Sequence, residues 1–288
     1  METSANGIYY ADETMGHPDL TSTAGSLVTL LNEILPLAGF SIAFSGTNKA
    51  VYRPDDVEDP RLFLRVDDSF GSNARIRGYE TMSDVDTGTG LFPTEAQVSG
   101  GFYFYKSNAA TARPWRFFSD GRKLYFFNDN AGGNSWDTGF EFGSGNSYVA
   151  NDVYDVSVSS GLSTNATWFF STLNNKNYAY LARAYNQQGS SIGSARYSHG
   201  KTTSTMGNSG QPFPAPADNR LHIHSIEYWD SVDNARGILP GLWNPIHDAD
   251  LPNQWEITNI PLLPGRTLVV QTMGSNRQCV VDKTGPWR

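Results

Sequence analysis

Two acidic residues in a glycine-rich segment have the spacing of the first half of a calcium loop. Asp84 and Asp86 open the segment 84–90, and Ca²⁺ prefers several oxygen ligands from one short loop. A complete loop of this kind also needs a bidentate carboxylate further along the chain, and Glu95 comes too early to supply it. We therefore expect an aspartate turn, in which side-chain oxygens accept hydrogen bonds from nearby backbone N–H groups.

A histidine pair is the other candidate metal site. His222 and His224 lie in a predicted strand, where a spacing of two places both imidazoles on one face. A third ligand would have to be His199, His247 or Glu227, and no spacing brings any of them to the pair. The alternation of the strand puts Glu227 on the opposite face. We therefore expect neither a metal nor another cofactor.

The residue types that support catalysis do not form a site in the sequence. Cys279 is the only cysteine, and its apolar neighbours are typical of a buried strand. Acidic residues are numerous between residues 55 and 86, which is the only support for a polysaccharide-degrading enzyme. No spacing among them selects the two facing carboxylates that glycoside hydrolysis requires. We therefore expect a protein that is not an enzyme and has no catalytic residues.

Aromatic residues are concentrated between residues 115 and 148, among asparagines and aspartates. Exposed rings can stack on sugars, but the cores of β-sandwiches also contain many aromatic residues. In the adjacent pairs 117–118 and 126–127, the alternation of a strand directs one ring of each pair away from the core. That ring must be covered by another layer or by a partner subunit, and we favour subunit contact over glycan binding. The candidate contact residues are Trp115, Phe118, Phe127 and Trp136.

The elements that position these residues begin with one amphipathic helix near the N-terminus. Hydroxyl residues at 21–23 can cap its start, and Pro36 and Gly39 mark its end. Its apolar residues have the i, i+3, i+4, i+7 spacing of a single stripe, which packs either on the body of the same chain or on a neighbouring subunit. The stripe consists of Leu27, Leu30, Leu31 and Ile34.

Residues 1–39 are predicted to form an attachment element, and residues 40–288 a β-rich body that folds without it. A helix of about 13 residues is too short to be stable alone in water, so its stripe must pack on something. An extended aromatic segment beside it could add to the sheet edge of a neighbour. The predicted attachment residues are Ile8, Tyr9 and Tyr10 together with the helix stripe.

After Phe40 the sequence has the alternation of β-strands. Residues 61–67 and 74–79 alternate on either side of a polar turn, which predicts a hairpin. Residues 115–128 predict a second hairpin around a tight turn at Asp120 and Gly121. Many short strands and almost no further helix indicate a mainly β protein. We expect an antiparallel β-sandwich or jelly-roll-like body with one short N-terminal amphipathic helix.

The composition indicates a folded protein and argues against some classes of partner. The 288 residues are 13% aromatic and 17% charged, which excludes a disordered chain. The net charge of −8 argues against nucleic acid as a partner, because proteins that bind phosphates are usually basic. No apolar run approaches the roughly 18 residues of a membrane helix, so we expect no membrane insertion.

Short segments along the whole chain carry a resemblance to one family. They are ADETM (residues 11–15), TAGSL (23–27), AFSGTNKAVYR (43–53), RVDD (65–68), RGYETMSDVDTGTG (77–90), FPT (92–94), KSNA (106–109), ARPW (112–115), RGILPGL (236–242) and DKTGPWR (282–288). In these segments, and in this order, the sequence resembles a family of virion structural proteins encoded in tailed-bacteriophage genomes, usually near the tail genes. Residues 128–216 match only weakly.

The resemblance implies a non-enzymatic virion structural protein that is made in the host bacterial cytoplasm. Its location would be the tail, the baseplate or a tail-associated appendage. Its partners would be other phage virion proteins and further copies of itself. Two alternatives stay open: a receptor-binding module that adheres to bacterial surface glycans, and a capsid-associated decoration protein.

Overall fold

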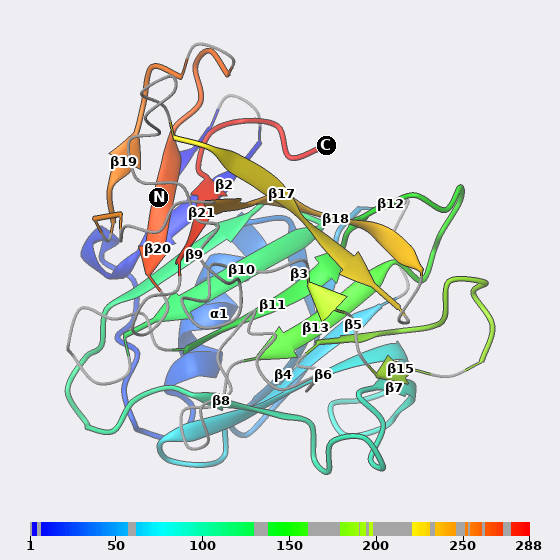
Figure 1. Ribbon diagram of the computed structural model, residues 1–288. Helices are drawn as coiled ribbons and strands as arrows, with labels where there is room; N and C mark the ends of the chain where they lie inside the picture. Colours follow the sequence, from blue (N-terminus) through cyan, green and yellow to red (C-terminus); the bar gives the residue numbers. More distant parts are fainter. Residues whose placement is uncertain are drawn as a thin grey trace, which may run out of the picture.

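Strands dominate the architecture. The computed structural model describes residues 2–4, 7–56, 62–129, 138–160, 179–189, 191–193, 196–197, 221–230, 234–245, 251–252, 254–260, 263–272 and 278–288. Within these residues, three antiparallel sheets accompany a single α-helix near the N-terminus (Figure 1). The predicted fold class, a mainly β antiparallel sandwich with one short N-terminal helix, is confirmed.

The first sheet has six strands and contains the first predicted hairpin. Its order is β3-β4-β5-β6-β7, with β8 paired to β6. In the β5–β6 hairpin, Arg65 lies opposite Arg77. The strands are β3 (Phe40–Gly46), β4 (Lys49–Pro54), β5 (Phe63–Asp67), β6 (Asn73–Met82), β7 (Gly88–Phe92) and β8 (Phe102–Tyr105).

The second sheet has eight strands and contains the second predicted hairpin, β9–β10. Its order is β1-β2-β9-β10-β11-β13-β14-β15, and we call it the central sheet. The strands are β1 (Glu2–Thr3), β2 (Tyr9–Asp12), β9 (Trp115–Ser119), β10 (Lys123–Asn128), β11 (Thr138–Ser144), β13 (Val156–Ser160), β14 (Ala179–Leu181) and β15 (Ile192–Gly193).

The third sheet has seven strands in the order β16-β17-β18-β21-β20-β19, with β12 paired to β18. Because β12 follows β11 after one residue, the chain passes there from the central sheet into the seven-stranded sheet. The strands are β12 (Asn146–Ser147), β16 (Arg196–Tyr197), β17 (Ile223–Trp229), β18 (Ala235–Pro245), β19 (Glu256–Ile257), β20 (Leu268–Thr272) and β21 (Gln278–Asp282).

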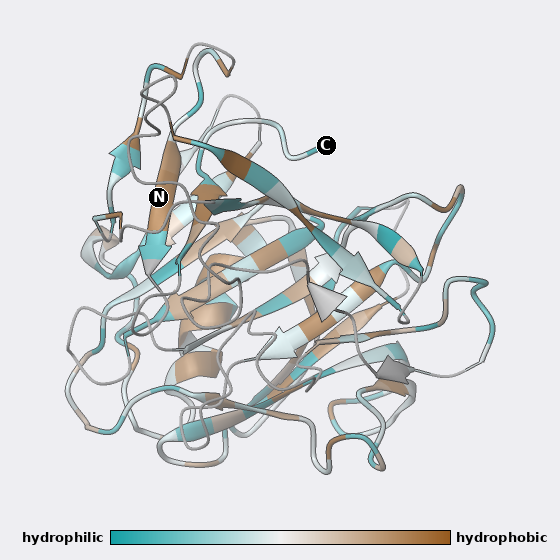
Figure 2. Ribbon diagram, in the orientation of Figure 1, coloured by the Kyte–Doolittle hydropathy of each residue, from teal (hydrophilic) through white to brown (hydrophobic). Residues whose placement is uncertain are grey.

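The central sheet is buried on both faces. Phe117 and Phe126 belong to the core that this sheet shares with the helix and the six-stranded sheet. Phe118 and Phe127 point the other way, into a second core that includes residues of β17, β18, β20 and β21. Hydrophobic residues therefore occupy neighbouring positions along β9 and β10 (Figure 2). A third layer of the same chain covers the outward rings, which corrects the expectation of subunit contact.

Helix α1 (Ser26–Leu37) packs against β3 and β4 in the first core. Its predicted stripe is fully buried, and Ile8, Tyr9 and Tyr10 are buried as well. The body of the chain is thus the surface on which these side chains pack. The hypothesis that they dock on a neighbour is corrected, because burying them in their own core leaves them no free surface.

The N-terminal region is also part of the sheet structure. Strand β2 pairs with β9, so that Tyr10 lies opposite Phe118. A turn of 3-10 helix, η1 (Glu13–Met15), follows. Asp12 caps its N-terminus, because the Asp12 side chain accepts the N–H of Thr14. Residues 1–39 therefore contribute a strand to the central sheet and a helix to the first core. The predicted division, in which the body from Phe40 folds without residues 1–39, stays a prediction.

Candidate functional site

The aromatic residues predicted to contact partners lie in the interior. Trp115 is 1% exposed, and its indole stacks on Phe126 with 5.9 Å between the ring centroids. Phe118 and Phe127 contact each other edge to face between two sheets. Trp136 lies outside the described residues. The three described residues are therefore closed to a sugar in solvent, which corrects the predicted contact site.

Asp84 and Asp86 form an aspartate turn. The Oδ1 atom of Asp84 accepts the backbone N–H of Asp86 at 2.7 Å. The carboxylate of Asp86 binds Lys49 Nζ at 2.9 and 3.1 Å and also binds the guanidinium of Arg65. These hydrogen bonds, that from Lys49 first, lower the pKa of Asp86. The loop is thus held to strands β4 and β5 of the six-stranded sheet by cations of the chain itself.

The histidine pair lies at the start of β17. Both ring nitrogens of His224 are engaged, Nδ1 with the carbonyl of Ser225 at 2.8 Å and Nε2 with the side-chain amide of Asn244 at 3.0 Å. Within the described ranges, no three histidine, cysteine or acidic side chains come together as a metal site would require. His199 and His247 lie outside those ranges.

Residues 189–193 read GSSIG and match the Gly-x-Ser-x-Gly pattern of a nucleophile elbow. That elbow requires the serine to stand between a strand and a helix. Here Ser191 leads directly into strand β15, and its hydroxyl donates a 3.0 Å hydrogen bond to Gln97 Oε1. The pattern is therefore present without the geometry that would activate a serine.

The structure does bring together two charged residues that are not among the predicted site residues. Asp68 follows β5, Lys106 follows β8, and both are completely buried at the N-terminus of α1. The Oδ2 atom of Asp68 accepts the backbone N–H groups of Leu27 at 2.7 Å and Val28 at 3.4 Å, which have no partner within the helix. Lys106 Nζ binds Asp68 Oδ1 and donates to the Thr23 carbonyl at 2.8 Å. We call these five residues the helix-cap site.

Burial dominates the electrostatics of the helix-cap site. It raises the pKa of Asp68 to about 6, although Lys106 and the backbone N–H groups act in the opposite direction. It also lowers the pKa of Lys106, against the attraction of Asp68. Both shifts favour the uncharged forms, a carboxylic acid beside an amine, because a low-dielectric interior penalises each charge.

The helix-cap site is the meeting point of several segments that carry the family resemblance. The backbone N–H of Gly25 binds the carbonyl of Asp68 at 2.9 Å, and the N–H of Asp68 binds the carbonyl of Asn48 at 2.8 Å. Gly25 has φ +85°, and a Cβ atom there would lie 2.3 Å from the side chain of Asn48. Segments 23–27, 43–53, 65–68 and 106–109 are thus interlocked, although they are far apart in sequence.

A second buried ion pair lies between the central and seven-stranded sheets. Lys123 on β10 binds Glu141 on β11, and both side chains are fully buried. Lys123 Nζ also donates to the Gly143 carbonyl at 3.0 Å and to Ser157 Oγ at 2.7 Å, and Ser157 donates to Glu141 at 3.1 Å. Burial lowers the pKa of Lys123, against the attraction of Glu141. The pair ties three strands of the central sheet together.

A neighbouring network joins the seven-stranded sheet to the segment before β13. The guanidinium of Arg236 on β18 binds both carboxylate oxygens of Asp152, at 2.8 and 3.0 Å, and the carbonyl of Tyr154 at 3.1 Å. Tyr228 on β17 donates to Asp155 Oδ1. Burial raises the pKa of Asp155 to about 7, with a smaller contribution from Asp152 in the same direction.

This network predicts a pH dependence of stability. The pKa of Asp155 is about 7 in the folded chain, above its ordinary value of 3.8, so the folded state binds the proton more tightly. Its contribution is complete below the ordinary pKa and is lost as the pH rises toward 7. Relative to Asp155→Asn, the wild type should lose on the order of a few kcal/mol between about pH 4 and about pH 8. Urea unfolding of both proteins across this range tests the prediction, and a constant difference would contradict it.

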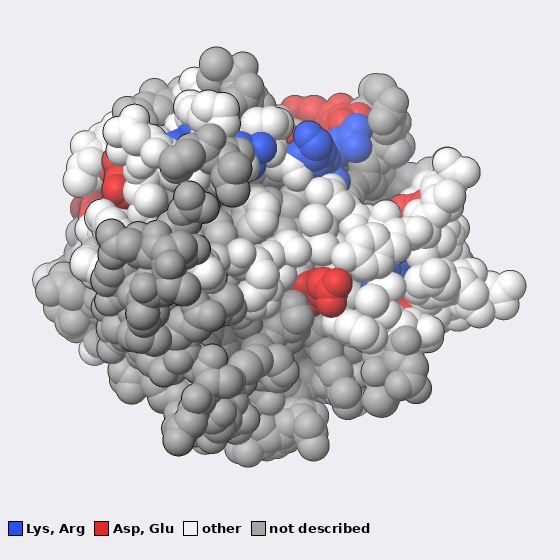
Figure 3. Space-filling view, turned by 45° about the horizontal axis from the view of Figure 1, so that its top comes forward, with Lys and Arg blue, Asp and Glu red and all other residues white. Residues whose placement is uncertain are grey.

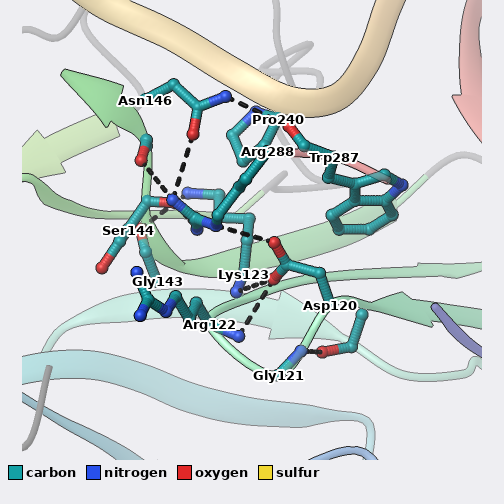
Figure 4. A network of polar contacts seen from close by, with 12 residues as sticks. Asp120, Gly121, Arg122, Lys123, Gly143, Ser144, Asn146, Pro240, Trp287 and Arg288 are labelled. Carbon is teal, nitrogen blue, oxygen red and sulfur yellow. Dashed lines mark hydrogen bonds and ion pairs between the residues drawn. The ribbon is translucent and has the colours of Figure 1, made fainter. Parts of the chain in front are cut away.

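Residues near the end of the sequence bind back onto the central sheet (Figure 4). Arg288 Nε donates to Asp120 Oδ2 at 2.8 Å, and its terminal nitrogens donate to the carbonyls of Ser144 at 2.9 Å and Gly145 at 2.7 Å. The indole of Trp287 donates to the carbonyl of the aspartate that ends β21. Trp287 and Arg288 thus join the β9–β10 turn and the end of β11 to β21.

Gly241 leaves room for the indole ring of Trp287, because glycine has no side chain. It has φ +69°, and a Cβ atom there would lie 2.1 Å from the ring. Gly265 has a similar φ of +76° but no neighbouring atom within 4 Å. Gly265→Ala should therefore cost only the backbone strain, about 1–2 kcal/mol, whereas Gly241→Ala should cost about 1–3 kcal/mol more through overpacking. Thermal and urea unfolding measure both variants, and equal losses would contradict this packing.

The buried networks hold elements together and are closed to substrates. The side chains of Lys106, Lys123 and Glu141 have no exposed surface, so a molecule in solvent does not reach them. On the described part of the face in Figure 3, the charged residues form small separate groups; one acidic group borders a basic group, and another acidic group stands alone. This arrangement differs from the continuous basic stripe that tracks a phosphate backbone.

No family model matches this chain, and no curated protein matches it. Among the described helices, none has the length and apolar character to cross a membrane.

Proposed function

We propose that this protein is a non-enzymatic structural subunit of a tailed-phage virion, in the tail, the baseplate or a tail-associated appendage. The convergence of family-like segments on the helix-cap site carries the proposal. Four of these segments bind one another around Asp68, through backbone hydrogen bonds and the buried contact with Lys106. Proteins with the same tertiary structure share the residues that contact one another in it. A resemblance spread over distant segments is therefore expected where those segments meet in one site.

The construction of the body also supports a structural role. Three sheets are stacked on one another. Buried polar contacts tie the helix to the six-stranded sheet and the central sheet to the seven-stranded sheet. Its buried charged groups are used in such ties and are closed to substrates. A subunit that stays folded in a particle outside the cell benefits from this stability. Its partners would be other virion proteins and further copies of the chain.

Mass spectrometry of purified phage particles tests the proposal. We expect peptides of this protein in particles at a constant ratio to the major tail proteins, and antibody labelling at the tail in electron micrographs. Labelling confined to the head would favour the capsid-decoration alternative. Absence of the protein from particles, although it is expressed in infected cells, would overturn the proposal.

Exposed aromatic residues in two loops that contact each other favour glycan adhesion as a second candidate. Tyr148 is 55% exposed and Tyr185 is 40% exposed. Their loops are joined by a hydrogen bond from the side-chain amide of Gln187 to the carbonyl of Asn151 at 3.3 Å. Rings presented beside amides in this way can stack on a sugar while the amides bind its hydroxyl groups. The same protein could therefore be both a virion part and an adhesin.

A binding assay on host cells separates this second candidate from a purely structural role. If the protein is an adhesin, multivalent wild-type protein should bind host cells or a glycan array, and Tyr148→Ala with Tyr185→Ala should reduce binding by tenfold or more. Val153→Ala, at an exposed position in the loop that also contains Tyr148, is a control for general surface effects. Failure of the multivalent wild type to bind would remove this candidate and leave the structural proposal intact.

A further inference from the structure

Lys106 and Asp68 meet under conditions that differ from those of an ordinary surface ion pair. Neither side chain has exposed surface, and Lys106 Nζ is in direct contact with Asp68 Oδ1. By contrast, Asp86 in the Lys49–Asp86 pair is half-exposed and its pKa is lowered, so that its carboxylate stays solvated and charged. An amine and a carboxyl group are thus held together at the helix-cap site without competing solvent.

We propose that Lys106 and Asp68 condense to form an intramolecular isopeptide bond between Lys106 Nζ and Asp68 Cγ. The inference stands on the geometry of the helix-cap site and is independent of the virion assignment. The bond would covalently join the segment after β5 to the segment after β8, directly beneath the first turn of α1.

The N-terminus of α1 supplies the groups that such a reaction needs. As an amine adds to a carboxyl group, negative charge develops on the oxygen that does not leave. Here that oxygen is Asp68 Oδ2, which already accepts the N–H groups of Leu27 at 2.7 Å and Val28 at 3.4 Å. These N–H groups also lie at the positive end of the helix dipole. They are therefore positioned as an oxyanion hole, while Lys106 is held on the other oxygen.

The step balances without any co-reactant. A proton passes from the Lys106 ammonium to Asp68 Oδ1, which leaves a neutral amine beside a carboxylic acid. The Nζ lone pair forms a bond to Cγ, and the π electrons of the carbonyl move onto Oδ2. The carbonyl then re-forms, the Cγ–Oδ1 bond breaks, and the hydroxyl takes a second proton from the nitrogen and leaves as water. Nothing is oxidised or reduced.

Two further features of the site agree with this step. Burial shifts the pKa of Asp68 upward to about 6 and the pKa of Lys106 downward, so the neutral reactants cost less than they would in water. The product amide keeps one N–H group. The carbonyl of Thr23, 2.8 Å from Nζ, is placed to accept it, so that the bond would leave no unpaired donor in the interior.

The mass of the intact, fully denatured wild-type chain tests the proposal. We expect a mass lower than the sequence mass by one water molecule. Fragmentation of a proteolytic digest should then give a branched peptide that joins Asp68 to Lys106. A mass equal to that of the sequence would overturn the proposal, and so would a loss of water that maps to other residues.

Lys106→Arg is the matched variant, because a guanidinium keeps the charge but does not form the amide under these conditions. We expect its full sequence mass, whether or not it folds as well as the wild type. Water can also be lost by succinimide formation at Asp120-Gly121, and that loss would persist in Lys106→Arg. Retention of the water loss in this variant would therefore contradict the proposal, while Lys123→Met should leave the cross-link in place.

Discussion

Replacing Leu30 with alanine should lower the free energy of unfolding by about 2–5 kcal/mol. Leu30 is completely buried and belongs to the core that the helix shares with the six-stranded and central sheets. Truncation removes apolar surface from that core and leaves a cavity, because the surrounding β-strands can relax only in part. Urea unfolding, followed by tryptophan fluorescence, measures the loss.

Leu37→Ala is the control for this prediction. Leu37 lies on the same helix but is 45% exposed, so the same substitution should change stability by no more than about 0.5 kcal/mol. The comparison also separates the two interpretations of the helix stripe. If Leu30→Ala were as stable as Leu37→Ala and yet failed to enter phage particles, the stripe would face a neighbour and its burial in this core would be refuted.

Replacing Lys123 with methionine should cost about 3–5 kcal/mol. Lys123 and Glu141 are both fully buried, and Lys123 also donates to Gly143 and Ser157. Methionine is of similar length but cannot neutralise Glu141, so a carboxylate would stay in the interior without its cation. The loss should appear as a lower urea midpoint.

A double variant and a surface control define the source of this loss. Lys123→Met with Glu141→Gln should recover part of the stability, because both buried charges are then removed. Lys49→Met removes a lysine from the exposed contact with Asp86 and should cost no more than about 1 kcal/mol. Equal losses in Lys123→Met and Lys49→Met would show that the Lys123–Glu141 pair is solvated, contrary to the structure.

The local elements could be predicted from the sequence because they depend on neighbours a few residues apart. The spacing of Leu27, Leu30, Leu31 and Ile34 predicted a helix, and α1 spans Ser26–Leu37. Alternation around a polar turn predicted the β5–β6 hairpin, and the turn at Asp120 predicted the β9–β10 hairpin. In each of these elements, the period of the side chains decides which residues share a face.

The partners of these faces could not be predicted, because the hydrophobic effect has no direction. The pairs 117–118 and 126–127 required that both faces of their strands be covered. Another sheet of the same chain and a second subunit would satisfy that requirement equally well. The answer depended on strands β17, β18, β20 and β21 of the seven-stranded sheet, which lie far along the chain at residues 223–282. The helix stripe could likewise have packed on the same chain or on a neighbour, and in the structure it lies in the first core.

The candidate site depended on tertiary structure even more strongly. The sequence by itself determined the fold class, the position of the helix and the two local hairpins, because these follow from side-chain period and turn chemistry. Asp68 and Lys106 are 38 residues apart, and no spacing rule connects an aspartate after one strand to a lysine after another. Only the pairing of β5, β6 and β8 and the packing of α1 bring them together. Tertiary structure decided this contact because burial, which changes the chemistry of both groups, is a property of the assembled layers and of no single segment.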